Sequence, residues 1–213
     1  MPTYATLLAD IPLTMMNSES AFVAQCPTFA QIAQDRLFRD LIVPALETNT
    51  TGSLVAGTAT LSNPTRLIAY RYVMLQASNA WITLPQRTLA VARQLYPSLS
   101  ASGTPAMWSV GTADNIVFTP APSIANPYDI RYRQKLAYLT GTDTNWLTDN
   151  AYDALLYASC AEASRFVQDD RQGSMIKIYE SQYAQAVSTI NGRAVPAAQD
   201  DYTLPFGSSG RAA

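Results

Sequence analysis

The sequence contains no histidine among its 213 residues. Histidine is the commonest general base and the commonest protein ligand of transition metals, so its absence removes every Ser-His or Cys-His nucleophile pair. A Gly-rich phosphate-binding loop and a dinucleotide-binding fingerprint are missing too. The sequence therefore predicts a protein that is not an enzyme, with no catalytic residue, metal or cofactor.

Charged residues are also scarce, at 14% of the chain, against about 25% in a typical globular protein. Uncharged polar residues take their place. Such a surface is weakly solvated and has little electrostatic self-repulsion. These properties favour a protein that buries much of its surface in contacts with other subunits. A soluble monomer with a polar, uncharged surface is the alternative interpretation. The apolar fraction of 48% is ordinary for a globular protein.

Long apolar runs and a basic-then-apolar amino terminus are both missing. The apolar stretches 41–46 and 67–75 are far too short to cross a bilayer, and Arg71 interrupts the second. We therefore expect a soluble chain without a secretory signal, made in the cytoplasm. Cys26 and Cys160 both lie among apolar residues of helical spacing, which favours two buried thiols over a disulfide or a metal pair.

Carboxylates are the remaining candidates for chemistry. Asp169 and Asp170 are neighbours whose side chains point apart, and a solvated turn explains them better than catalysis does. Glu162 lies between apolar helical positions and is expected to pair with Arg165 or Arg36. Three more acidic residues lie near a predicted helix start, where the helix dipole favours negative charge: Asp143, Asp149 and Asp153. None of these patterns indicates an active site.

Helical periodicity marks both ends of the chain. A helix is predicted from about Ala21 to Pro27, and a second from there to Pro44 with Phe29, Ile32, Ala33, Leu37 and Leu41 on one face. Near the other end, a helix capped by Thr148 or Asp149 carries a stripe of Tyr152, Leu156, Cys160, Ala163 and Val167. A turn at 169–173 leads to a last helix with the stripe Met175, Tyr179, Tyr183, Ala186 or Val187, and Ile190. Together these helices predict a three-helix bundle.

The middle of the chain has strand character. Residues 50–60 contain Gly52 and Gly57 among β-branched residues and predict a hairpin, and 66–76 predicts a buried strand. A helix is expected over 84–96, with Leu84, Val91 and Leu95 on its stripe. Further strands are expected over 107–111, 115–119 and 128–138. The predicted fold is α+β: a helical bundle from 1–47 and 141–190, a β-rich insertion from 48–140, and an extended C-terminal arm from 191–213.

One strand of the insertion carries a basic pattern. Alternation places Arg131, Arg133 and Lys135 on one face of the strand and apolar side chains on the other. The segment 61–140 has seven basic and two acidic residues, whereas 141–190 has three basic and seven acidic ones. Segregated charge suits identical subunits packed head to tail in a ring, so these three residues are candidates for a subunit interface or a channel surface. A solvated strand face is the alternative.

The C-terminal arm is too poor in periodic apolar residues to fold alone. It nevertheless contains four apolar anchors: Val195, Tyr202, Leu204 and Phe206. An extended arm of this kind can bind along a neighbouring protein and become ordered on contact.

The order of several short motifs resembles that of the head-to-tail adaptor, or connector, proteins of tailed double-stranded DNA phages, particularly short-tailed phages. The resemblance covers about 18–190. Its motifs are the helix at 29–40, the Gly52 to Gly57 segment, Leu95-Tyr96-Pro97, residues 103–108, residues 116–122, residues 128–132, Asn145-Trp146-Leu147, residues 152–157, and the closing helix with Tyr179 and Tyr183. Each motif is weak alone, and their shared order is what is specific.

This resemblance implies a structural virion protein at the head–tail junction, assembled in the host cytoplasm. It implies a dodecameric ring that docks beneath the portal protein and presents its other face to the tail nozzle or tail tube. DNA would pass through the lumen with only transient, non-specific contact, and no membrane or cofactor is involved. The family offers no catalytic residues to carry over.

Three other hypotheses remain at this point. A tail-completion or stopper protein would also be a ring subunit, but would lie farther from the portal. A monomeric carbohydrate-binding module would use Trp81, Trp108 and Trp146, although core packing explains scattered tryptophans better. A hydrolase with paired Asp residues is the third.

Overall fold

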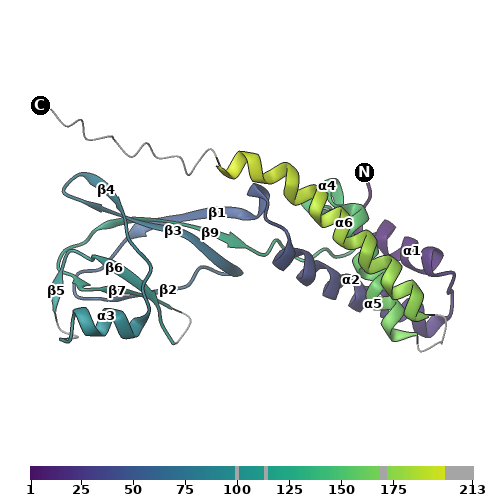
Figure 1. Cartoon of the computed structure of the whole chain (residues 1–213), viewed down its shortest axis with the longest axis horizontal. Helices are drawn as coiled ribbons and strands as arrows, with labels where there is room; N and C mark the ends of the chain where they lie inside the picture. The colour runs from purple at the N-terminus through teal and green to yellow at the C-terminus, as the bar shows by residue number, and fades with distance from the viewer. Residues whose placement is uncertain (99–100, 113–114, 168–171, 200–213) are drawn as a thin grey trace, which may run out of the picture. The chain divides into compact units, whose positions relative to one another are not determined.

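The chain divides into a helical unit and a β-rich unit (Figure 1). The computed structural model describes residues 1–98, 101–112, 115–167 and 172–199. The helical unit comprises Met1–Leu46 and Leu136–Ala213, and the β unit comprises Glu47–Lys135. The chain is therefore α+β, as the sequence predicts, with the β unit inserted into the helical one.

The helical unit is organised around one helix that is rich in small residues. Its helices are α1 (Tyr4–Met15), α2 (Ser20–Asp40), the short 3-10 turn η1 (Pro44–Leu46), α4 (Trp146–Asn150), α5 (Tyr152–Phe166) and α6 (Gln172–Gln199). α5 contacts α1, α2 and α6. Six of its buried side chains are those of alanine or serine: Ala154, Ala158, Ser159, Ala161, Ala163 and Ser164. Small side chains let neighbouring helices approach closely, which explains why α5 occupies the centre.

The amino-terminal helices differ from the prediction. α1 is an additional helix, closed by a capping box in which Thr3 accepts a hydrogen bond from the Thr6 backbone at 3.2 Å. It contributes Leu7 and Ile11 to the core. The predicted interruption at Pro27 is wrong, because α2 runs unbroken from Ser20 to Asp40. Pro27 lies on the exposed side of α2, where water can hydrate the carbonyl that proline leaves unbonded.

The predicted pairing of the last two helices is confirmed, since α5 and α6 pack together. Their start and their stripes differ in detail. Asn145, not Thr148 or Asp149, caps the chain where it becomes helical, and a break at Ala151 separates α4 from α5. On α6, Tyr179 and Tyr183 are buried as predicted, whereas Met175 is partly exposed.

Charged and hydroxyl groups fasten α6 to the rest of the unit. Arg36 of α2 donates from Nη1 and Nη2 to the two oxygens of Glu180, at 2.9 and 2.5 Å. The Arg36 guanidinium also lies 4.0 Å from the centroid of the Tyr183 ring. The Tyr183 hydroxyl donates to Asp40 at 2.6 Å. Among the α6 side chains that the structure describes, only Tyr179 and Tyr183 are buried, so these polar contacts add to the attachment of the helix.

α6 also continues farther than the sequence indicates. Residues 191–199 are helical, although they were predicted to begin an extended arm. Asn191 fastens this part of the helix, because its Nδ2 donates to the Asp40 carbonyl at 2.9 Å and its Oδ1 accepts from the Ile42 backbone at 2.7 Å. Residues 200–213, the remainder of the predicted arm, lie outside the described residues.

The β unit contains one antiparallel four-stranded sheet, ordered β1-β9-β3-β4, and a smaller sheet ordered β2-β7-β6. The strands of the first are β1 (Glu47–Ser53), β9 (Pro127–Gln134), β3 (Leu67–Ala77) and β4 (Ala80–Thr83). Those of the second are β2 (Thr60–Ser62), β7 (Asn115–Thr119) and β6 (Met107–Val110). β5 (Ser102–Gly103) and β8 (Ala121–Pro122) form a short parallel pair, and α3 (Leu89–Leu95) completes the unit.

Both larger sheets contribute to one apolar core. Its buried members are Leu54, Val73, Leu75, Leu84, Trp108, Ile116, Phe118, Ile130 and Tyr132. The Trp108 indole nitrogen donates to the Leu84 carbonyl at 3.2 Å, so a polar group buried in this core is satisfied. One face of the four-stranded sheet therefore covers the core, and the alternate side chains lie on its other face.

The predicted hairpin over 50–60 is wrong. β1 pairs with β9, and β2 pairs with β7, so the two predicted arms have different partners. Gly57 does lie at a turn, with φ of +77°. Gly52 lies within β1, where an added Cβ would be 2.5 Å from the Tyr128 hydroxyl. Close approach of a neighbouring side chain, not a turn, requires this glycine.

Two other boundaries are corrected. α3 begins at Leu89 rather than near Leu84, because the Thr88 side chain caps it and Leu84 extends the sheet through a backbone bond to Val73. Val91 and Leu95 are exposed, so the predicted stripe of this helix is wrong. β9 ends at Gln134, short of the predicted 138. The strands predicted at 66–76, 107–111 and 115–119 are confirmed as β3, β6 and β7.

Candidate functional site

Three arginines surround one carboxylate on the face of the four-stranded sheet that points away from the core. The strand register places Glu47 opposite Arg133 and Asn49 opposite Arg131. Arg71 Nε donates to Glu47 Oε1 at 2.7 Å, and Arg131 Nε donates to Oε2 at 3.0 Å. The single carboxylate thus bridges two guanidinium groups, with the third close by.

The predicted basic triplet does not form one exposed face. Arg133 is only 9% exposed. Burial lowers the pKa of Arg133, the nearby Arg71 lowers it further, and Glu47 opposes both. Lys135 lies just beyond the end of β9, where its backbone nitrogen donates to the Arg66 carbonyl at 2.8 Å.

Arg131 is the most accessible of the arginines around Glu47, with a side chain that is 37% exposed. Burial tends to lower the pKa of Arg131, but Glu47 and a hydrogen bond with Tyr72 outweigh it and raise the pKa. A hollow of about 280 Å³ opens beside this side chain, lined by Glu47, Thr48, Asn49, Tyr72 and Arg131. It offers a guanidinium face, an aromatic ring and an amide, which suits contact with a planar or polar side chain.

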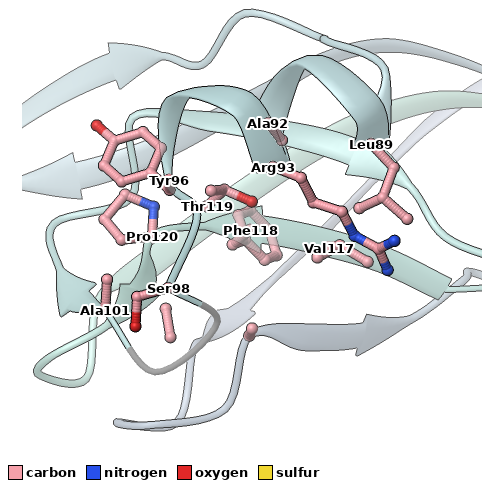
Figure 2. A pocket seen from close by; sticks show the side chains of 12 residues that line it. Leu89, Ala92, Arg93, Tyr96, Ser98, Ala101, Val117, Phe118, Thr119 and Pro120 are labelled. Atoms are coloured by element: carbon pink, nitrogen blue, oxygen red, sulfur yellow. The ribbon is translucent and has the colours of Figure 1, made fainter.

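A second, smaller pocket lies between α3 and β7 (Figure 2). Leu89 and Arg93 of α3, with Tyr96 just after it, lie on one side, and Val117 and Pro120 lie on the other. Its volume is about 60 Å³, room for only a few atoms. The predicted stripe of this helix included neither Leu89 nor Arg93, so nothing in the sequence pattern indicates this pocket.

Most of the predicted acidic residues have structural roles. Asp143 accepts hydrogen bonds from the backbone and hydroxyl of Thr140 at 3.3 and 2.7 Å. Asp149 and Asp153 lie in the first turns of α4 and α5, as predicted. Glu162 pairs with Arg165 and, at 4.0 Å, with Arg36, which confirms that prediction. Asp169 and Asp170 lie outside the described residues.

The described part of the chain shows no group of three residues that could hold a metal ion. Nor does any helix in it have the length and apolar character needed to cross a membrane. The two cysteines are buried and unbridged, as predicted. The tryptophans are dispersed: Trp108 is in the β core, Trp81 is exposed on β4, and Trp146 begins α4.

A family model identifies the family to which this protein belongs. A family model described as SU10 adaptor protein matches residues 2–207. The chain belongs to the SU10 adaptor protein family. The protein is therefore a phage adaptor with a structural role in the virion. No curated protein matches its sequence.

The two units of the adaptor carry opposite net charge. The β unit has seven basic and three acidic residues, a net charge of +4. The rest of the chain has seven basic and thirteen acidic residues, a net charge of −6. The segregation found in the sequence thus follows the boundary between the units.

The predicted docking arm is only partly described. Val195 lies on the helical backbone of α6. Tyr202, Leu204 and Phe206 lie outside the described residues. The docking role of these four apolar residues therefore stays a prediction from the sequence.

Proposed function

We propose that the adaptor is one subunit of a ring, a dodecamer, that joins the portal of the phage head to the tail nozzle or tail tube. DNA passes through its lumen with only transient, non-specific contact. The protein carries out no catalytic chemistry.

The observation that carries the proposal is the division of charge between the units, +4 against −6, in a chain of an adaptor family. Identical copies with one positive and one negative surface attract each other head to tail, and head-to-tail contacts form a ring when the rotation between neighbours closes. A chain with so few charged residues also has little self-repulsion to overcome. We expect the free adaptor to be monomeric or weakly associated, and to assemble into a ring when it binds the portal.

The test is to mix the purified adaptor with portal protein and determine mass and shape by native mass spectrometry and negative-stain microscopy. The expected result is a portal carrying a closed ring of adaptor, lost as salt rises, because surface attraction is screened beyond about 8–10 Å at physiological ionic strength. An adaptor that leaves the portal bare contradicts the proposal. An adaptor that binds only preassembled portal–tail complexes instead supports a tail-completion or stopper role.

We assign Arg131, Arg133 and Lys135 to a subunit boundary or to the channel surface. Arg133 is buried, so Arg131 and Lys135, which are partly exposed, are the residues to substitute. Arg131→Ser together with Lys135→Ser should lower the melting temperature only slightly, because Glu47 keeps its hydrogen bond from Arg71. The double variant should weaken ring assembly most at low salt, and its deficit should shrink as rising salt screens the charges of the native protein. Exposed Arg87→Ser is the matched control. Unchanged assembly and unchanged phage yield refute the assignment.

We assign the carboxyl-terminal segment that carries Tyr202, Leu204 and Phe206 to docking on the portal or on the adjacent adaptor subunit. Its acidic and apolar composition suits binding along a partner. Deleting residues 200–213 should leave thermal stability nearly unchanged but reduce attachment to portal-bearing heads. Truncated protein that docks as well as the full chain shows that the segment has no such role.

A further inference from the structure

The four-stranded sheet of the β unit has two open edges. β1 pairs with β9 alone and β4 pairs with β3 alone among the described strands. Proteins usually protect such edges with charged side chains, proline or bulges, since unpaired backbone groups invite another strand. Here neither 48–65 nor 72–86 contains a charged residue. β4 contains no proline, and all four of its residues are exposed.

These two edges complement each other. Every pairing in the sheet is antiparallel, so β1 and β4 run in opposite directions. If β4 of one copy lies beside β1 of another, the antiparallel alternation continues without interruption. Because the two edges differ, this contact is head to tail, and its repetition generates a ring or a filament rather than a dimer.

One side chain on the β4 edge is placed to strengthen the contact. Trp81 is 47% exposed and lies opposite Gln76, while Tyr72 lies opposite Arg131. Side chains alternate along a strand, so Gln76 and Tyr72 share a face of the sheet. Trp81 at one edge and the hollow beside Arg131 at the other edge are therefore on the same face of the sheet.

We propose that β4 of one adaptor copy pairs with β1 of the next, so that Trp81 covers the hollow lined by Glu47, Thr48, Asn49, Tyr72 and Arg131. The indole ring then lies on the partly exposed Arg131 guanidinium, a favourable arrangement of a cation and an aromatic face. The hollow, at about 280 Å³, receives the ring. This inference rests on the proposed ring and names the surfaces that close it.

Disulfide trapping in the assembled ring tests the strand pairing directly. Thr83 lies opposite Met74 and thus shares the face of Trp81, and Asn49 and Thr51 share that face on β1. Thr83→Cys combined with Asn49→Cys or with Thr51→Cys, oxidised after assembly on the portal, should give a ladder of covalent oligomers for at least one combination. The native Cys26 and Cys160 are buried and do not interfere.

Two controls fix the face and the orientation of the contact. Ile82 lies opposite Leu75, which belongs to the core, so Ile82→Cys with the same β1 cysteines should not cross-link. Single-cysteine variants should remain uncrosslinked alone, and a mixture of Thr83→Cys with the matching β1 variant should stop at dimers. Thr83→Cys protein that cross-links to itself indicates pairing of two β4 strands and overturns the proposal.

The Trp81 contact is tested by measuring the protein concentration at which rings assemble. Trp81→Ala and Arg131→Ala should each raise this concentration about tenfold. The double variant should need a concentration little higher than either single variant, because both substitutions remove the same contact. Val55→Ala, which removes another exposed apolar side chain of the β unit, should have little effect. This inference is refuted if rings form normally but no cysteine pair cross-links, or if Trp81→Ala protein assembles at the same concentration as the native protein. Either result leaves the proposed ring function intact. A native adaptor that forms no ring refutes both.

Discussion

The ion pair between Arg36 and Glu180 provides a direct test of how α6 is held. In the Glu180→Gln variant the side chain keeps its size but loses its charge and one of its strong acceptors. Glu180 is 27% exposed and Arg36 is 21% exposed, so the pair is shielded enough from water to contribute. A hydrogen bond to a charged group contributes about 1.5–3 kcal/mol. Glutamine can keep one of the two bonds, so we expect a loss of about 1.5 kcal/mol.

The pH dependence of that loss has a definite sign. The hydrogen bond from Arg36, aided by Arg165, holds the pKa of Glu180 below its ordinary value of 4.5. A carboxylate whose folded pKa is depressed stabilises the fold above its unfolded pKa, and this stabilisation disappears as the pH falls through the folded pKa. The difference between native protein and Glu180→Gln should therefore be full at neutral pH and shrink below about pH 4.5.

The assay is urea unfolding followed by far-UV circular dichroism, which reports mainly on the helical unit. Exposed Glu19→Gln, whose side chain has no ion pair recorded in the described structure, is the matched control. It should change stability by no more than about 0.5 kcal/mol. The reasoning is refuted if Glu180→Gln matches this control at neutral pH, or if its deficit is the same at neutral and acidic pH.

Three further predictions concern the packing of each unit. Tyr183→Phe removes the hydrogen bond to Asp40, 2.6 Å long, and should lower the unfolding free energy by about 1 kcal/mol; an unchanged urea midpoint would contradict that attachment. Gly52→Ala should destabilise the β unit by about 1–3 kcal/mol, because its Cβ would lie 2.5 Å from the Tyr128 hydroxyl; thermal unfolding checks this, with exposed Thr51→Ala as the control. Burial raises the pKa of Cys160 to about 12 and also raises that of Cys26, so both thiols should resist a thiol reagent at pH 8 until urea unfolds the chain. A thiol that reacts at once in the native protein would show that the helical core is open.

The elements that could be predicted are those whose own periodicity determines them. The stripe around Tyr179 and Tyr183 and the apolar run of β3 both report burial directly. The two cysteines were placed correctly for the same reason, as small apolar residues in a helical pattern. Pairing of Glu162 with nearby arginines followed from a charged residue lying between apolar positions.

The errors arose where a distant partner decides the structure. Gly52 suggested a turn, but it is required by Tyr128, which is far along the chain. The strand register brings Glu47 opposite Arg133, and Arg131 donates a hydrogen bond to the same carboxylate. The predicted basic face is therefore a partly buried ion cluster. α1 has only a short run of apolar residues and a proline in its last turn, so its formation depends on packing against α2 and α5. The hollow at the edge of β1 has no sequence signal, because strands distant in sequence form it.

The insertion of the β unit has a consequence for folding. Its first residue, Glu47, lies opposite Arg133 near its end, so a folded β unit holds its two chain ends together. The helical unit cannot be completed before α5 reaches α2, a contact across the whole inserted segment Glu47–Lys135. Closing an unstructured loop of that length costs about 3 kcal/mol more than closing one of a few residues. A β unit that folds first during synthesis removes most of this entropic cost, because it holds the two segments of the helical unit near each other before they pack.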